Sequence, residues 1–508
     1  MQNPSLQQRR NRIRPKGAPS QGNKYSKSSL NVNEKKGGVS AFLLFIFGLI
    51  LFGGLFYVDH ITHSNIRHRL HIPEGDNYKM SKQEAELYKS NSNAAYSNDN
   101  LHADDGRMYH LIFSTDCSEF QHWQSYLLFH TAMKVKQPGT VTRIASGCSE
   151  DDAVKAKKWH KEHVSDVFGN HFILHLTPHF SGVKDKDGKT VGDYKFFNKP
   201  FGLKHWLEIG LGFAENSKTK LNNEDDVVIL IDPDMILLRP ITGDFSNDRD
   251  VVIGKENEKD RKLKVEHGSP FAQKYGLGAQ WRTFNLHEIA GADSPAKKVT
   301  QNDANVHYPV GPPYIGTVRD MYAISQKWTE FVPRVHKEYP YLLAEMYAYC
   351  IAAAHLELPY QLIDSLMISN TGAGGEGWPM VDKIPHEEAC DFARHPDHSK
   401  YAVPSVIHLC QRYSVGDWFF GKRKMTKDFF ECESPLMEEP PSNVVVESDY
   451  KFPPGGTRKE IDTKTAQREG FMVCSITSAL NEAAVFYKKN HCNGEGNMEK
   501  TLNLAKLK

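Results

Sequence analysis

The chain has 508 residues, of which 39% are hydrophobic and 25% are charged, a composition typical of a folded globular protein. Its formal net charge is only +1, which argues against a nucleic-acid-binding function, because such proteins carry an excess of basic residues. The charge is unevenly distributed, however, since residues 1–38 hold nine Lys or Arg and a single acid, Glu34. This segment has too little apolar surface to fold, and we expect a disordered basic tail.

The next segment, Val39–Val58, reads VSAFLLFIFGLILFGGLFYV and contains no charged residue. Twenty helical residues rise roughly 30 Å, the thickness of one hydrocarbon core, so this segment predicts a transmembrane signal-anchor helix. A soluble core helix would need polar residues on one face, and a cleaved signal peptide would have a shorter apolar run. Because the basic flank is N-terminal, the positive-inside rule places residues 1–38 in the cytosol and the remainder in the lumen, a single-pass type II orientation.

Residues 59–106 are polar and predict a stem, and residues 107–430 predict a globular domain. Within this domain, short apolar runs predict strands, and amphipathic segments between them predict helices. This alternation predicts an α/β fold with a mainly parallel sheet flanked by helices. The chain turns rich in Pro and Gly beyond about Glu431, so residues 431–508 are interpreted as a C-terminal extension. The predicted strands lie at 109–115, 141–146, 172–176, 227–231 and 251–254.

The chain contains eight cysteines, and none of them forms a close CxxC pair. That spacing argues against a zinc module, whereas an even number permits disulfides in an oxidising lumen. Eight cysteines allow 105 connectivities, so the pairing stays open.

The sharpest local motif is Asp232-Pro233-Asp234, which directly follows the continuous apolar run Val227–Ile231, rich in β-branched residues. In open α/β sheets, ligands bind beyond the carboxyl ends of the strands, where two carboxylates can hold a hard divalent cation. Such a cation can bridge a diphosphate and stabilise a leaving nucleotide. The alternative is a turn capped by Asp side chains. An acidic motif of this kind after a buried strand, in a lumenal type II protein, is the arrangement expected of a Golgi glycosyltransferase that uses a nucleotide sugar.

Six stretches within about residues 108–425 hold unusual combinations of residues: HLIFSTDCSEFQHWQ (110–124), QPGTVTRI (137–144), NKPFGLKHWL (198–207), VVILIDPDMILLRPI (227–241), EMYAYCIAAAHL (345–356) and IHLCQRYSVG (407–416). In these stretches the chain resembles the plant and algal family of hydroxyproline O-arabinosyltransferases and peptidyl serine α-galactosyltransferases. The run DPDMILLRPI is similar to the galactosyltransferase form, whereas Pro233 agrees with the arabinosyltransferase form, so the donor sugar and the acceptor stay open.

The resemblance implies a GT-A-like fold, Mn²⁺ as the usual metal, and transfer with retention of anomeric configuration. It implies that arabinofuranose or galactose passes from a UDP-sugar to hydroxyproline or serine of a secretory glycoprotein in the Golgi. Asp232 and Asp234 are assigned to the metal and the donor diphosphate, with Asp234 as the direct ligand and a catalytic residue. His408 is a candidate third ligand, because GT-A enzymes often complete the metal shell with a C-terminal His; a buried structural His is the alternative.

Further candidates follow from the residue types. Ser114 and Thr115 end the first predicted strand, where nucleotide contacts are expected, and Arg143 and Lys199 can neutralise phosphate or form ordinary ion pairs. Glu345 begins a predicted helix, so it is a candidate catalytic carboxylate that orients the acceptor hydroxyl, or a charge that complements the helix dipole. Candidates for the acceptor side are Trp206, which has core packing as its alternative, Tyr314 and Tyr347.

The competing hypothesis is a membrane-tethered protein that kept this fold, binds sugar or protein, and lost catalysis. The intact pair of Asp232 and Asp234 favours the enzyme.

Overall fold

The computed structural model describes residues 106–506, except for 185–186, 214–222, 247–261 and 453–455. The predicted cytosolic tail, the anchor segment 39–58, nearly all of the stem, and the strand predicted at 251–254 lie outside the described residues. No helix in the described part of the chain is both long enough and apolar enough to cross a membrane.

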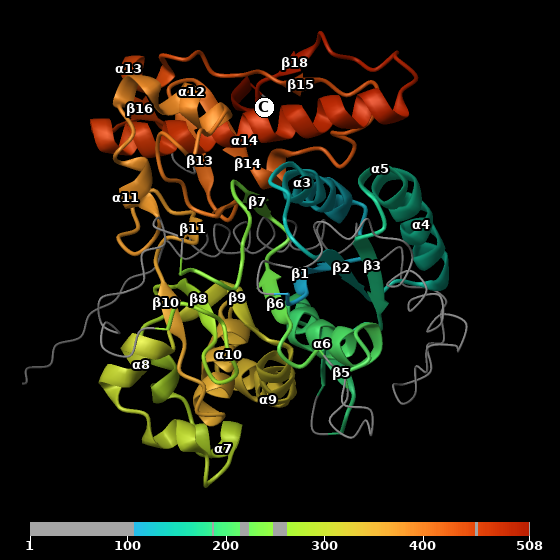
Figure 1. The fold of residues 1–508 in the computed structure, drawn as a ribbon, viewed down its shortest axis with the longest axis vertical. Coiled ribbons are helices and arrows are strands. Elements are labelled where there is room, and N and C mark those ends of the chain that lie inside the picture. The colour runs from blue at the N-terminus through green and yellow to red at the C-terminus, as the bar shows by residue number, and fades with distance from the viewer. Residues whose placement is uncertain (1–105, 185–186, 214–222, 247–261, 453–455, 507–508) are drawn as a thin grey trace, which may run out of the picture. The chain divides into compact units, whose positions relative to one another are not determined.

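Seven strands of the described chain form one sheet in the order β10-β8-β9-β6-β1-β2-β3 (Figure 1). The β6–β1, β1–β2, β2–β3 and β10–β8 pairs are parallel, and only β9 runs antiparallel to its neighbours. The prediction of a mixed, mainly parallel α/β sheet is therefore confirmed. The seven strands are β1 (Tyr109–Asp116), β2 (Thr140–Ser146), β3 (Phe172–Thr177), β6 (Val227–Ile231), β8 (Phe271–Lys274), β9 (Val310–Thr317) and β10 (Gln361–Ile363).

Strand β6 is buried on both faces, as its uninterrupted apolar run predicts. Val227, Ile229 and Ile231 join a core that includes helix α3, and the alternate residues Val228 and Leu230 join a second core that includes α6, α9 and α10. The helices are α3 (Phe120–Lys134), α4 (Glu150–His160), α5 (Asp166–Phe168), α6 (Asn198–His205), α7 (Leu286–Ala290), α8 (Gln301–His307), α9 (Val318–Glu338), α10 (Ala344–His355), α11 (Trp378–Val381), α12 (Ala389–Arg394), α13 (Val444–Glu447) and α14 (Thr463–His491).

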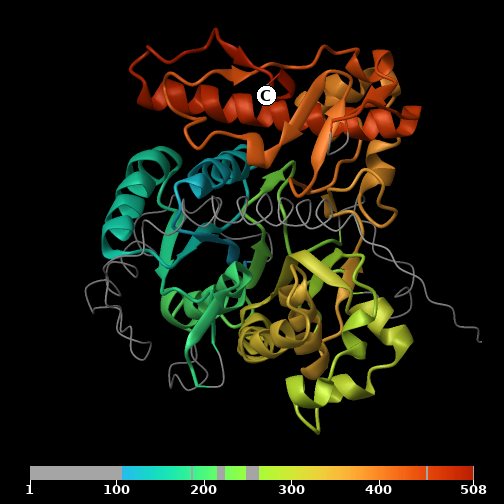
Figure 2. The same ribbon diagram turned by 180° about the vertical axis from the view of Figure 1, so that it is seen from behind.

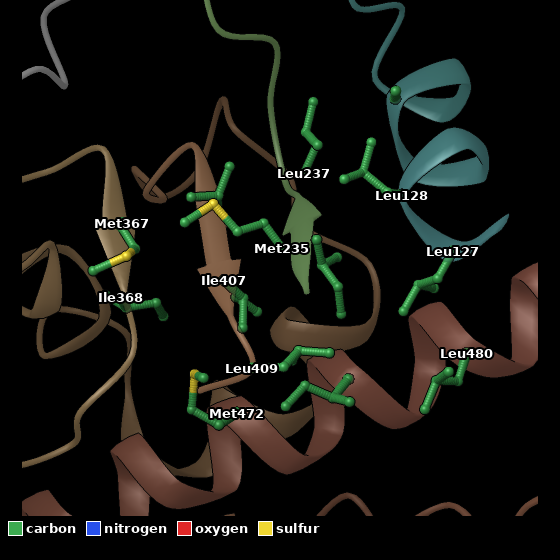
Figure 3. Close-up of a cluster of buried hydrophobic side chains, with 14 of the residues drawn as sticks. Leu127, Leu128, Met235, Leu237, Met367, Ile368, Ile407, Leu409, Met472 and Leu480 are labelled. Atoms are coloured by element: carbon green, nitrogen blue, oxygen red, sulfur yellow. The ribbon is translucent and has the colours of Figure 1, made fainter. Parts of the chain in front are cut away.

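A second, smaller sheet with the order β11-β12-β7 lies between the main sheet and α14. Figure 3 shows apolar side chains of this sheet, among them Met235, Leu237 and Ile407, in one cluster with Leu128 of α3 and with Met472 and Leu480 of α14. In both overall views α14 runs across one end of the described fold, the end at which β7 and the β13–β14 hairpin lie (Figures 1 and 2). The remaining strands are β4 (Gly182–Lys184), β5 (Thr190–Asp193), β7 (Met235–Leu237), β11 (Met367–Ile368), β12 (Val406–His408), β13 (Arg412–Val415), β14 (Trp418–Gly421), β15 (Leu436–Met437), β16 (Tyr450–Lys451), β17 (Lys459–Glu460) and β18 (Thr501–Leu502).

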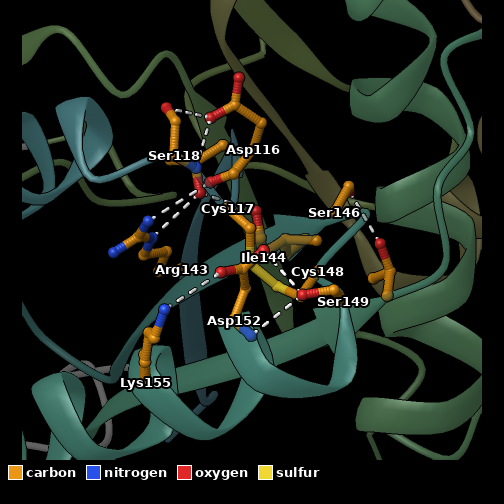
Figure 4. The surroundings of a disulfide bond; sticks show 12 residues. Asp116, Cys117, Ser118, Arg143, Ile144, Ser146, Cys148, Ser149, Asp152 and Lys155 are labelled. Atoms are coloured by element: carbon orange, nitrogen blue, oxygen red, sulfur yellow. Dashed lines mark hydrogen bonds and ion pairs between the residues drawn. A yellow bond between two sulfur atoms is a disulfide. The ribbon is translucent and has the colours of Figure 1, made fainter. Parts of the chain in front are cut away.

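Three disulfides connect segments of the described chain. Cys117–Cys148 joins the ends of β1 and β2 (Figure 4), Cys390–Cys474 joins α12 to α14, and Cys432–Cys492 joins the end of α14 to the segment before β15. Cys350 is a buried free thiol, and Cys410 is an exposed one. Apolar residues of α14, which lies within the predicted extension 431–508, pack into the same hydrophobic core as residues of β7 and β12.

Candidate metal and donor site

The Asp-Pro-Asp motif lies where the main sheet gives way to the small one. Strand β6 ends at Ile231, which pairs with Phe113 of β1, so the last residues of β1 continue beside the motif. Directly after Asp234 the chain enters β7, whose first residue, Met235, pairs with His408 at the end of β12. The backbone N–H of Leu409 donates to the carbonyl of Asp234 across 2.8 Å. The β7–β12 pairing therefore brings a histidine from the C-terminal third of the chain to the motif.

Asp232, Asp234 and His408 each direct one potential ligand atom into a common space, and these atoms lie within 4.8 Å of one another. The Nε2 atom of His408 is 3.3 Å from Oδ1 of Asp234 and 3.8 Å from Oδ2 of Asp232. Asp234 and His408 are buried, and Asp232 is partly exposed. Two carboxylate oxygens and one imidazole nitrogen suit Mn²⁺ and related divalent cations, and partial exposure at Asp232 leaves room for further ligands. The donor set therefore fits the Mn²⁺ that the family resemblance implies.

The charges of this cluster stabilise one another. Burial alone would raise the pKa of Asp234, but His408 and Lys422 outweigh it and hold the pKa of this carboxyl well below its usual range. Burial alone would lower the pKa of His408, but Asp234 outweighs it and raises this pKa well above its usual range. The histidine is fixed from two further sides, because the hydroxyl of Tyr413 donates to its carbonyl at 2.8 Å and the hydroxyl of Tyr275 lies 3.4 Å from its Nδ1.

Two lysines complete the site. Lys199, in the first turn of α6, places its Nζ 2.7 Å from Oδ1 of Asp232 and 3.2 Å from Oε1 of Glu345. Burial alone would lower the pKa of Lys199, but the two carboxylates outweigh it and raise the pKa above its usual range. Lys422, from the short helical turn after β14, donates to Oδ2 of Asp234 while its side chain remains 31% exposed. An accessible ammonium at that point can also contact a phosphate.

The other predicted donor contacts lie along the end of β1. Arg143 of β2 is buried, and its Nε donates to the hydroxyl of Thr115 at 3.0 Å. Its Nη2 lies 3.4 Å from the carbonyl of Asp116, beside the Cys117–Cys148 disulfide (Figure 4). Ser114 faces α6, since a Cβ added at Gly202 would lie 3.8 Å from its hydroxyl oxygen. The structure thus places Arg143 and Thr115 in contact with each other. Among the described residues, no contact joins either of them to Asp232 or Asp234.

The three aromatic candidates for the acceptor side are buried. Trp206 is 1% exposed and packs edge-on against His110, with the ring centroids 5.6 Å apart. Tyr314 of β9 stacks on Tyr349 at 4.0 Å. Tyr347 of α10 donates its hydroxyl to the side-chain oxygen of Gln280 at 2.6 Å. For Trp206 the arrangement matches the core-packing alternative.

Two residues of the site were not among the sequence candidates. Lys422 begins the basic run KRK, which ordinarily indicates a solvated surface, and only the proximity of Asp234 gives it another meaning. Tyr275 directly follows β8, which the sequence analysis did not predict as a strand. Its hydroxyl contacts His408 and the sulfur of Met367, two residues far apart in sequence, so no local pattern could have indicated it.

Comparison with known proteins places the chain near the glycosyltransferases. No protein-family model matches it. It is similar to the peptidyl serine alpha-galactosyltransferase of Arabidopsis thaliana, with 25% identity over 342 residues, and to the protein of the same name from Chlamydomonas reinhardtii, with 28% identity over 132 residues. These matches cover 65% and 26% of this chain and 34% and 14% of the two relatives, so the chain spans about a third or less of the relatives that it matches. A solved structure of the bifunctional glycosyltransferase WbbM in its apo form shares 10% identity, covers 62% of this chain and 47% of its own, and has a TM-score of 0.29.

Proposed function

We propose that this chain is a metal-dependent glycosyltransferase that transfers a sugar from a UDP-sugar to hydroxyproline or serine of secretory glycoproteins with retention. The observation that carries the proposal is the convergence of Asp232, Asp234 and His408 beyond the carboxyl end of β6. The name shared by the two relatives favours galactose as the sugar and serine as the acceptor. The apolar segment Val39–Val58 and its basic flank support a Golgi type II membrane protein with a lumenal site.

Each residue of the site has a task under this proposal. Asp232, Asp234 and His408 would hold Mn²⁺, which when bound supplies Lewis-acid stabilisation of the departing diphosphate. Lys422 is the accessible cation beside Asp234, so it would neutralise the charge that develops on the leaving group. Lys199 fixes one oxygen of Asp232 and leaves the other directed toward His408.

The proposal is tested with the full chain purified in detergent. UDP-galactose, UDP-arabinofuranose and UDP-glucose are each offered with serine or hydroxyproline peptides, with Mn²⁺ or with EDTA, and UDP release and peptide mass are measured. One donor should support Mn²⁺-dependent transfer, and Asp234→Asn should lower it by more than about a hundredfold, because a ligand carboxylate is lost. Asp225→Asn is the matched control, since Asp225 is exposed and lies before the start of β6.

Two results would refute the proposal. If the wild-type chain turns over none of the donors and binds no UDP-sugar, it is not a glycosyltransferase of this kind, and a binding role is favoured. If Asp234→Asn retains full metal-dependent transfer, the site has been placed at the wrong residues.

A further inference from the structure

Three charged side chains form a continuous row that leads from the candidate metal site into the core. Asp232 contacts Lys199, and Lys199 contacts Glu345 in the first turn of α10. Exposure decreases along this row, from 17% for the side chain of Asp232 to 11% for Lys199 and 3% for Glu345. The two helices that supply Lys199 and Glu345 thus meet through a buried ion pair directly behind a metal ligand.

Glu345 is held rigidly in this position. Its backbone N–H donates to the hydroxyl of Tyr194 at 3.2 Å, and its carbonyl accepts a hydrogen bond from the indole N–H of Trp328 at 2.8 Å. With its side chain 3% exposed, its carboxylate is directed at Lys199 and has almost no accessible surface on which to bind an acceptor hydroxyl. Glu345 is therefore poorly placed to touch a substrate but well placed to restrain Lys199.

The restraint on Lys199 has a consequence for Asp232. A carboxylate rotates easily about its last torsion, so its two oxygens are interchangeable unless a partner selects one. Lys199 engages Oδ1 of Asp232, which leaves Oδ2 directed at His408 across 3.8 Å. A free lysine side chain samples many rotamers, and holding it in one costs entropy. Because Glu345 also contacts the ammonium of Lys199, this entropy is lost when the protein folds rather than when a metal binds.

We propose that Glu345 is a positioning residue, which acts through Lys199 to hold Asp232 in the orientation that binds the metal. The proposal rests on the proposed function for the presence of a metal, and it adds a role that differs from acceptor activation. Partners behind metal ligands typically change metal affinity 10- to 100-fold when they are mutated. Glu345→Gln keeps the shape of the side chain and removes the charge that holds Lys199.

The test measures Mn²⁺ binding directly, by the electron paramagnetic resonance signal of free Mn²⁺ titrated into the full chain in detergent, without donor or acceptor. Glu345→Gln should weaken binding by about tenfold or more. Lys199→Met should weaken it to a similar extent and gives the same information if Glu345→Gln does not fold. Adding Glu345→Gln to Lys199→Met should cause no further loss, because Glu345 acts only through the lysine.

Asp320→Asn is the matched control. Asp320 is 1% exposed, and its Oδ1 lies 2.6 Å from Nδ1 of His267. It follows β9 where Thr317 pairs with Val227 at the start of β6, away from the metal ligands. This variant also converts a buried, paired acid to its amide, and its Mn²⁺ affinity should stay within about twofold of the wild type.

The outcomes separate this inference from the proposed function. If Glu345→Gln binds Mn²⁺ as tightly as the wild type but has a lower kcat with serine peptides, Glu345 acts on the acceptor and the inference is wrong. If the losses from Lys199→Met and Glu345→Gln add, Glu345 does not act through Lys199 and the inference is again wrong. If the wild-type chain binds no Mn²⁺ at all, the metal site of the proposed function fails, and this inference fails with it.

Discussion

Acid should destabilise this protein in part through His160, at the end of α4. The residue is 6% exposed, its Nε2 lies 3.0 Å from the carbonyl oxygen of Phe172, and its ring packs edge-on against Phe129. Burial lowers its pKa from 6.5 to about 3, although the bond to Phe172 opposes that change. Between these two values the unfolded chain binds a proton that the folded chain does not, so stability falls as the pH falls below about 6.5. For one proton, each pH unit below about 6.5 lowers the free energy of unfolding by about 1.4 kcal/mol. His160 alone should therefore lower the free energy of unfolding by about 2 kcal/mol at about pH 5.

The measurement is urea unfolding of the wild type and of His160→Gln at about pH 7.5 and pH 5. Glutamine can still donate to the carbonyl of Phe172 but does not titrate, so the variant should lose about 2 kcal/mol less than the wild type between the two pH values. His287→Gln is the control, because His287 is exposed. Equal losses in the wild type and His160→Gln would refute the reasoning. Four other histidines have pKa values that burial lowers to about 3 or 4, so the wild type should remain acid-sensitive beyond the share of His160; they are His122, His130, His175 and His205.

Three further changes test other parts of the structure. Lys422→Met removes the accessible cation beside Asp234 and should lower kcat for sugar transfer about tenfold in initial-rate assays, because charge on the leaving group develops in the transition state. An unchanged kcat would contradict the role given to this lysine. Replacing both Cys390 and Cys474 by Ser opens a loop of 84 residues, which in the chain-entropy account lowers the free energy of unfolding by about 4.5 kcal/mol. If urea unfolding shows a loss below about 1 kcal/mol, α14 is held mainly by packing. Gly202→Leu should cost about 1–3 kcal/mol, because even a Cβ would lie 3.0 Å from Ile144, whereas a loss below about 0.5 kcal/mol would mean that α6 can shift away from the sheet.

The parts of the fold that local sequence determines were predictable. Strand β6 was recognisable because burial on both faces requires an uninterrupted apolar run, and Val227–Ile231 supplies one. The acidic pair was placed correctly beyond that strand for the same reason, since the end of the apolar run marks the end of the strand. Glu345 was placed at the start of a predicted helix, and it lies in the first turn of α10, which begins at Ala344.

The parts that depend on pairing between distant segments were not predictable. Strand β9 contains GPP, a sequence that ordinarily indicates a loop, yet it lies antiparallel between β6 and β8 and is buried along its whole length.

The sequence around a single arginine likewise gives no sign of whether its side chain faces a ligand or the protein interior. Arg143 is buried and contacts Thr115, and the indole ring of Trp159 lies 5.7 Å from its guanidinium. Burial lowers the pKa of Arg143 to about 10.

The charges of the site explain why its residues come from such separate segments. Three acids face three bases: Asp232, Asp234 and Glu345 are matched by Lys199, His408 and Lys422. A buried carboxylate is tolerated only when a partner offsets the cost of removing it from water, so each acid requires a base within reach. Neighbouring residues on one strand point to opposite faces and cannot supply those bases, whereas the start of α6, the end of β12 and the turn after β14 can. The two carboxylates are therefore a local feature of the sequence, but the site that they define is a product of the tertiary fold.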